Sequence, residues 1–298
     1  MTIIESDNRH AETTRKALSY FKELADSLDD WEFVSETSDV KLYKKTVEGQ
    51  DLPIVRGDTI LSGKDYTLSQ VAAVATQPGC RKVWDEKFDV AEVKEAFTFR
   101  ETLFWSKLKT PWPMSPRDLS GTAIRDVGED AVYVSMTSVE DADIPEIYGN
   151  VRATLYVSGW KASPVPEGVA ITYITQIDIA GSIPSSFLAS IQQQIPLCAG
   201  KVVEYIETHG YCPYLLECSA VYEEEHFNHD EKEYVLNLKA EQADAIAKLD
   251  ISSRLYPQGI NVDIEGGAEY KIEDGANGNK VLTIHNIEGA ATVKVTSA

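Results

Sequence analysis

The chain has 298 residues, of which 43% are hydrophobic and 26% are charged, and its formal net charge at pH 7 is −20. A surface this acidic repels nucleic-acid phosphates, so composition argues against a DNA- or RNA-binding protein. No apolar run approaches the roughly 20 residues of a membrane helix, and the N-terminus lacks the pattern of a signal peptide. With four sparse, irregularly spaced cysteines, these features predict a cytoplasmic protein with reduced thiols.

The first part of the chain is expected to contain a helix, a run of short strands and a long final helix. Residues 11–28 predict the first helix, because their apolar side chains follow a 3.6-residue period. A second helix is expected over residues 68–76, continuing to about residue 85. The strands predict one curved antiparallel sheet and are expected at 31–36, 40–46, 53–61, 88–94, 97–106, 118–126, 131–138, 151–160 and 169–179.

The final helix of this part is expected to run from Pro184 to His209. Proline suits a helix start, whereas Pro196 is expected to kink the middle of the helix. Its apolar face includes Phe187, Ile191 and Ile195.

The chain changes character near residue 218. A strongly charged segment there is followed by short stretches in which apolar and polar residues alternate with a period of two. We therefore divide the chain into a domain over residues 1–218 and a second domain over residues 219–298. The second domain is expected to be a small antiparallel β-sandwich.

Four segments of the first domain resemble one known family in their residues, order and spacing. They are CRKVWDEKF (80–88), KTPWPMSPRDL (109–119), IPEIYGNVRA (144–153) and TQIDIAGSIPSSFL (175–188). Together they resemble the START (StAR-related lipid transfer) family, and within it the phosphatidylcholine transfer protein branch. The resemblance implies an α+β helix-grip fold, in which a curved antiparallel sheet wraps around the last helix and encloses a cavity. The tail after residue 218 lies outside the resemblance.

The resemblance implies a protein that binds and transfers lipid, and not an enzyme, with no metal or other cofactor. A 16-carbon acyl chain left in water costs on the order of 12 kcal/mol, so a carrier must enclose its cargo. The expected partners are a lipid and, briefly, a membrane surface. A phospholipid is favoured, and a sterol or another apolar ligand is the alternative.

The resemblance assigns Arg81 and Asp85 to the lipid head group, because a guanidinium binds phosphate and a carboxylate compensates its charge. Spacing alone favours an ordinary exposed ion pair at i and i+4 of a helix. The aromatic residues expected to contact lipid are Trp84, Trp105 and Tyr173, although core or rim packing is an open alternative for Trp84. The family's aromatic cage for choline is incomplete, since Leu119 stands where the branch has a tyrosine.

The segment 139–150 is expected to be a gate loop, whose Ile144, Ile147 and Tyr148 touch the membrane; a simple exposed turn is the alternative. Two other functions remain open. A cyclase- or aromatase-like enzyme would need an acid or base in the cavity, for which the candidates are Tyr133, Tyr156, Tyr173 and Asp85. A lipid-sensing adaptor would bind a protein partner through residues 219–298.

Overall fold

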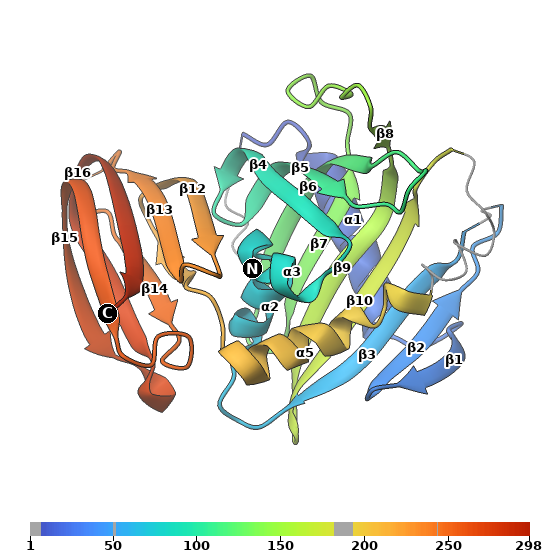
Figure 1. Ribbon diagram of the computed structural model, residues 1–298, viewed down its shortest axis with the longest axis horizontal. Helices are drawn as coiled ribbons and strands as arrows, with labels where there is room; N and C mark the ends of the chain where they lie inside the picture. The colour runs from blue at the N-terminus through green and yellow to red at the C-terminus, as the bar shows by residue number, and fades with distance from the viewer. Residues whose placement is uncertain (1–6, 50–51, 182–192, 243) are drawn as a thin grey trace. The chain divides into compact units, whose positions relative to one another are not determined.

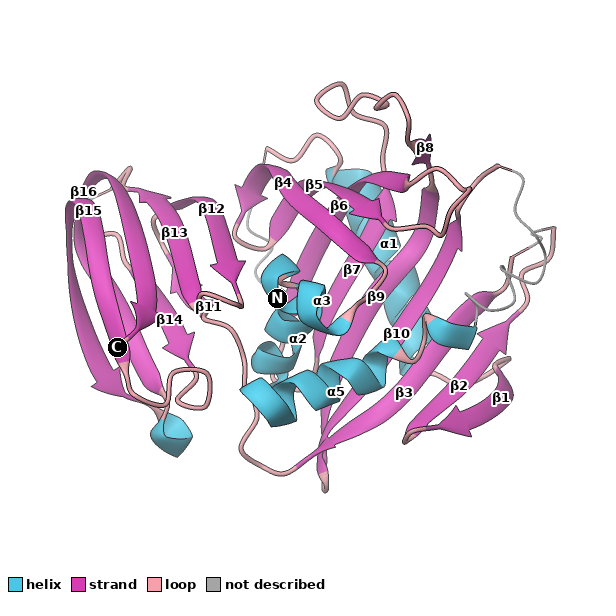
Figure 2. Ribbon diagram, in the orientation of Figure 1, coloured by secondary structure: helices cyan, strands magenta, loops and turns pink. Residues whose placement is uncertain are grey.

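Two sheets, almost entirely antiparallel, account for most of the structure (Figures 1 and 2). The computed structural model describes residues 7–49, 52–181, 193–242 and 244–298. The chain divides into one unit of Met1–Ala72 with Trp84–Glu204 and a second unit of Ala73–Val83 with Tyr205–Ala298. Compared with the expected boundary at 218, the second unit also includes residues 73–83 and 205–218. Within the described residues, no helix is both long and apolar enough to cross a membrane.

The first sheet has ten strands in the order β1-β2-β3-β10-β9-β7-β6-β5-β4, and the short strand β8 pairs with β6. The expected order of the strands is found, with ends that differ by a few residues, although the strand expected at 151–160 is divided into β8 and β9. The strands are β1 (Glu32–Thr37), β2 (Val40–Lys45), β3 (Ile54–Ser62), β4 (Phe88–Thr98), β5 (Glu101–Leu108), β6 (Arg117–Val127), β7 (Val132–Ser138), β8 (Val151–Arg152), β9 (Thr154–Val165) and β10 (Gly168–Asp178).

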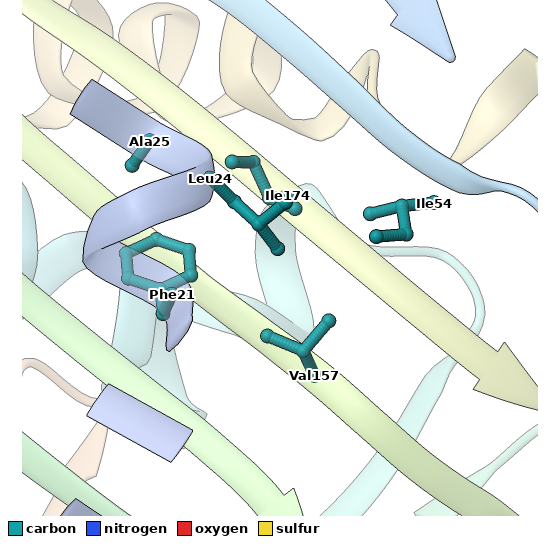
Figure 3. Close-up of a cluster of buried hydrophobic side chains, with 6 residues drawn as sticks. All are labelled: Phe21, Leu24, Ala25, Ile54, Val157 and Ile174. Carbon is teal, nitrogen blue, oxygen red and sulfur yellow. The ribbon is translucent and has the colours of Figure 1, made fainter. Parts of the chain in front are cut away.

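One face of this sheet is covered by α1 (Ala11–Asp26), which confirms the first predicted helix. The apolar side of α1 packs onto three strands in a fully buried cluster (Figure 3), formed by Phe21, Leu24, Ala25, Ile54, Val157 and Ile174. Gly159 allows the close approach, because a Cβ atom there would lie 2.6 Å from the Phe21 ring. We call this side of the sheet the α1 face.

The opposite face, here the α5 face, lies beneath helix α5 (Figure 1). Gly57 on β3 lies directly against the backbone of Pro196, whose carbonyl oxygen would be 2.1 Å from a Cβ atom at position 57. Residues 195–197 form a bend and turn, and α5 (Cys198–His209) follows. The chain is therefore non-helical around Pro196, as proline chemistry predicts. The second predicted helix is two helices, α2 (Leu68–Thr76) and α3 (Pro78–Trp84).

The second sheet is antiparallel, as expected, and the sandwich arrangement stays a prediction. Its strands form one hydrogen-bonded sheet in the order β11-β14-β16-β13-β12, with β15 on the other edge of β16. The long strand β16 pairs first with β14 and then with β13 along one edge, and this joins what would otherwise be two sheets. The strands are β11 (Tyr214–Cys218), β12 (Val221–Asn228), β13 (Glu233–Lys239), β14 (Ala247–Ile251), β15 (Ile260–Asp274) and β16 (Lys280–Ser297), and a short 3₁₀ turn, Ala276–Gly278, precedes β16.

Candidate functional site

The α5 face of the first sheet is apolar but incompletely covered. Residues directly opposite each other on paired strands share a face, so Gly57, Tyr173, Trp160 and Val134 all belong to the α5 face. Several apolar side chains of this face in the middle strands are only half-buried: Phe104, Leu108, Ala123, Met136, Tyr173 and Ile177. An apolar face that lies under a helix and still leaves such side chains accessible can accept an apolar ligand.

A row of three aromatic rings crosses this face. Trp84, at the end of α3, meets Trp160 of β9 edge-to-face with ring centroids 5.9 Å apart. Trp160 in turn stacks on Tyr173 of β10 at 4.2 Å. The structure thus brings together two of the predicted residues, Trp84 and Tyr173. Sequence reasoning missed Trp160, although its alternation with Ser158 and Ala162 along β9 places the three on one face.

The predicted polar pair, Arg81 and Asp85, stands on either side of Trp84 in the sequence. Asp85 is buried, and its Oδ1 accepts a hydrogen bond from the backbone N–H of Lys87 at 3.1 Å. Arg81 is half-buried on α3. Lys87, which the sequence did not single out, donates to Gln194 Oε1 at 2.7 Å and links this turn to the segment before α5. Burial lowers the pKa of Lys87 below its ordinary value.

Trp105 lies on the other side of the sheet. It packs with Leu103 and Ile144 in a separate buried cluster, and its Nε1 donates to Asp118 Oδ2 at 3.0 Å. Since Trp105 pairs with Ser120, and Leu103 with Thr122, this cluster belongs to the α1 face. The structure therefore does not bring Trp105 together with Tyr173. A period of two puts neighbouring strand residues on opposite faces but does not say which face is which.

A buried ionic network fixes the base of the predicted gate loop. Asp118 accepts hydrogen bonds from Trp105 and from Arg152, whose Nε lies 2.9 Å from Oδ1. Burial alone would raise the pKa of Asp118, but these hydrogen bonds outweigh it and hold the pKa below its ordinary value. Arg152 also donates to the carbonyl oxygen of Pro145. At the other end of the loop, Arg9 and His10 both contact the carboxylate of Asp141.

The predicted gate residues differ in their surroundings. Ile144 is buried in the cluster with Trp105 and does not reach the surface. Ile147 and Tyr148 are exposed, with Tyr148 completely accessible. The loop 109–116 leaves the sheet beside them, because the Val151 N–H bonds to the Pro116 carbonyl and β8 pairs with the start of β6. Trp112 on that loop is 93% exposed.

Three predicted residues come from the helix expected over residues 184–209, the first part of which lies outside the described residues. Phe187 and Ile191 lie outside the described residues. Ile195 is half-buried in the bend before α5, where its carbonyl accepts the Cys198 N–H. Arg117, at the start of β6, donates to the carbonyls of Ile179 and Ala180, directly after the end of β10.

Comparisons with known proteins bear on the fold of the chain. No family model matches the chain. An uncharacterized protein of Pseudomonas aeruginosa is 26% identical over 173 residues, which is 57% of this chain and 82% of that protein. Human StAR-related lipid transfer protein 5 superposes with a TM-score of 0.60 at 18% identity, covering 66% of this chain and 96% of that one. Human STARD10 superposes with a TM-score of 0.57 at 20% identity, covering 69% of this chain and 81% of that one.

A bacterial structure extends this likeness. The STAR-related lipid transfer protein of Xanthomonas axonopodis superposes with a TM-score of 0.50 at 25% identity, over 59% of this chain and 97% of the solved fragment. The chain therefore has the fold of StAR-related lipid transfer domains over about two-thirds of its length. This supports the START resemblance seen in the sequence. The phosphatidylcholine transfer branch remains a prediction.

Proposed function

We propose that the chain binds one lipid against the α5 face of the first sheet and carries that lipid between membranes in the cytoplasm. The half-buried apolar side chains of the α5 face are the observation that supports lipid binding most directly. Similarity in fold to human and bacterial StAR-related lipid transfer proteins supports it independently. Acyl chains would replace water along Phe104, Met136 and Ile177, at about 0.8 kcal/mol per buried CH₂.

We further propose a phospholipid as the cargo. The resemblance assigns the head group to Arg81 and Asp85, which lie on either side of Trp84 in the sequence, and a guanidinium binds phosphate through charge-assisted hydrogen bonds. An aromatic row also offers faces to a cationic head group. Tyr173 is the ring of this row that keeps accessible surface, because Trp84 and Trp160 are buried.

Membrane contact would be made by the paired loops. Trp112 and Tyr148 are strongly exposed at loops that leave the sheet side by side. Tryptophan and tyrosine favour the interface between lipid and water, because one end of each side chain is apolar and the other polar. Brief contact through such tips suits a protein whose net charge of −20 disfavours steady binding to anionic lipids.

The two alternative functions, a sterol carrier and a cyclase-like enzyme, need different residues on the α5 face. A sterol carrier would use the same apolar face without Arg81. A cyclase-like enzyme would need its acid or base on that face, but Tyr133 donates to Asp26 on the α1 face and Tyr156 is exposed at the surface. Tyr173 and Asp85 are the candidates left to it, so we favour a carrier without catalytic activity.

Native mass spectrometry of the purified full-length protein tests the proposal. A carrier should show a mass increase of one lipid that disappears on solvent extraction, and fragmentation of the extract identifies the head group. A sterol in that extract would replace the phospholipid assignment. Protein that carries no lipid, and takes none up from mixed phospholipid and sterol vesicles, would rule out the carrier function.

A further inference from the structure

The second sheet presents one long edge strand. Strand β15 is 15 residues long, and in the described part of the chain it pairs with β16 alone. An unpaired strand edge offers a row of backbone N–H and C=O groups to any chain that can extend along it. Edge strands usually limit such pairing through prolines, lysines or short length, and β15 has no proline and a single lysine.

The other edges of this sheet are less available. On β12, Gly79 of α3 lies against the carbonyl of Phe227, and Gln77 donates to Glu225. β11 is only five residues long and is interrupted by a bulge between Leu215 and Glu217. On β15 itself, an irregularity around Gly266 and Gly267 divides the strand, and the arm Glu269–Asp274 follows in regular register with β16.

The arm Glu269–Asp274 has two chemically different faces. Tyr270 and Ile272 stand opposite Ile284 and Leu282, which are fully buried, so both lie on the core face of the sheet. Yet Tyr270 is 45% exposed and Ile272 39% exposed, and within the described residues β15 pairs only with β16. Glu269 and Glu273 alternate with them on the other face. A strand added here would complete an apolar row on one side and meet carboxylates on the other.

The charge of β15 distinguishes two possible partners for this edge, a second copy of the chain and a different protein segment. β15 carries five carboxylates against one lysine, Lys271, which pairs with Glu273 at 2.8 Å. Pairing two copies of β15 would bring these acidic rows together, and like charges on adjacent strands are destabilising. A strand that alternates apolar and basic residues would instead place opposite charges beside Glu269 and Glu273.

We propose that β15 binds an extended protein segment by strand addition, and that this segment alternates apolar residues with lysine or arginine. The assignment rests on the second unit alone and does not depend on lipid binding. It would give the chain a protein partner through residues 219–298.

The test uses the full chain and a capped peptide in which lysine and valine alternate over the length of the arm. Saturable binding should protect backbone amides of Glu269–Asp274 from hydrogen exchange. The double substitution Glu269→Lys with Glu273→Lys should weaken binding at least about tenfold. Glu223→Lys with Glu224→Lys, on the exposed surface of β12, makes the same change in charge and should leave binding within about twofold of the unmodified chain.

Three outcomes would overturn the proposal. The first is equal weakening by the two double substitutions. The second is equal binding, by the unmodified chain, of a peptide of the same charge with prolines in place of the valines, since that peptide cannot form a strand. This comparison needs no variant and holds even if the substitutions disturb folding. The third is a dimer of the unmodified chain that Ile272→Asp dissociates, which would assign the edge to a second copy.

Discussion

The two faces of the first sheet are built from the same alternating strands but are covered in different ways. On the α1 face, Phe21 and Leu24 fill the space above the strands, and Ile54, Val157 and Ile174 beneath them are inaccessible to solvent. On the α5 face, Phe104, Met136 and Tyr173 keep part of their surface accessible. Each face also has a glycine where a covering segment touches the sheet, Gly159 on one and Gly57 on the other.

This difference separates folding from binding. A side chain such as Phe21 contributes about 1.5–3 kcal/mol when it is fully buried, so the α1 face can stabilise the sheet by itself. The α5 face then need not be filled by the protein's own side chains. A ligand that enters there stabilises the folded chain only to the extent that it binds.

Matched phenylalanine truncations should give the largest contrast. Phe21→Ala leaves a cavity in the closed α1 face and should lower the free energy of unfolding by about 3–5 kcal/mol. Phe104→Ala removes the same ring from the half-buried α5 face and should cost about 1 kcal/mol, because little buried contact is lost. Urea unfolding of lipid-free protein measures both values. Similar costs for the two substitutions would mean that the α5 face is also closely packed.

Small-to-large substitutions on the two faces should give the next largest contrast in stability. Ser135 is buried on the α1 face beside Gly159, where the Phe21 ring leaves no room, so Ser135→Trp should destabilise the chain by about 3 kcal/mol. Ala123 is half-buried on the α5 face, and Ala123→Trp should change stability by less than about 1 kcal/mol while excluding lipid. Thermal unfolding and lipid uptake from vesicles are the measurements. An Ala123→Trp protein that retains a full complement of lipid would place the ligand elsewhere.

The sequence predicts the elements better than it predicts the faces. The period of α1 and the alternation of the strands are local, and both are found in the structure. Which side of β5 faces α1 depends on contacts between distant residues, such as Thr14 with Thr122. The resemblance that assigns Trp105 to the lipid site does not contain this information. The second sheet shows the same limit, since the pairing of β16 with two strands along one edge has no local signal.

The polar end of the α5 face can be tested with a smaller change. Arg81→Met keeps a long apolar side chain but removes the guanidinium, and should weaken phospholipid retention by about tenfold, the value of one charge-assisted contact. Lys82→Met, at the exposed neighbouring position, is the matched control and should retain lipid normally. Quantitative lipid extraction measures both. Sterol binding that is equal in all three proteins, without any effect on phospholipid, would transfer the ligand assignment to the sterol alternative.

Lowering the pH should affect the contacts at the end of α5 and those at the start of α1 over different pH ranges. This is the smallest change in stability that we predict. At the end of α5, His229 Nδ1 lies 2.8 Å from the hydroxyl of Tyr205, and Lys232 donates to Nε2. Burial, with the charge of Lys232, lowers the pKa of His229 to about 4. Burial also lowers the pKa of the adjacent His209. At the start of α1, by contrast, the hydrogen bond from Arg9 holds the pKa of Asp141 below its ordinary value.

The signs of the two effects set separate pH ranges. Between about pH 6.5 and 4 the unfolded chain protonates His229 and the folded chain does not, so stability falls as pH falls through that range. Asp141 keeps its contribution until the pH drops below about 4, where the unfolded carboxylate takes up a proton. Because His229 is only half-buried, solvent screens its environment, and we expect a loss of about 1 kcal/mol. Urea unfolding at pH 7 and pH 5 should show this loss in the unmodified chain and in His226→Gln, whose side chain is exposed, and much less of it in His229→Gln. An equal pH dependence in all three proteins would mean that the end of α5 does not respond to acid through His229.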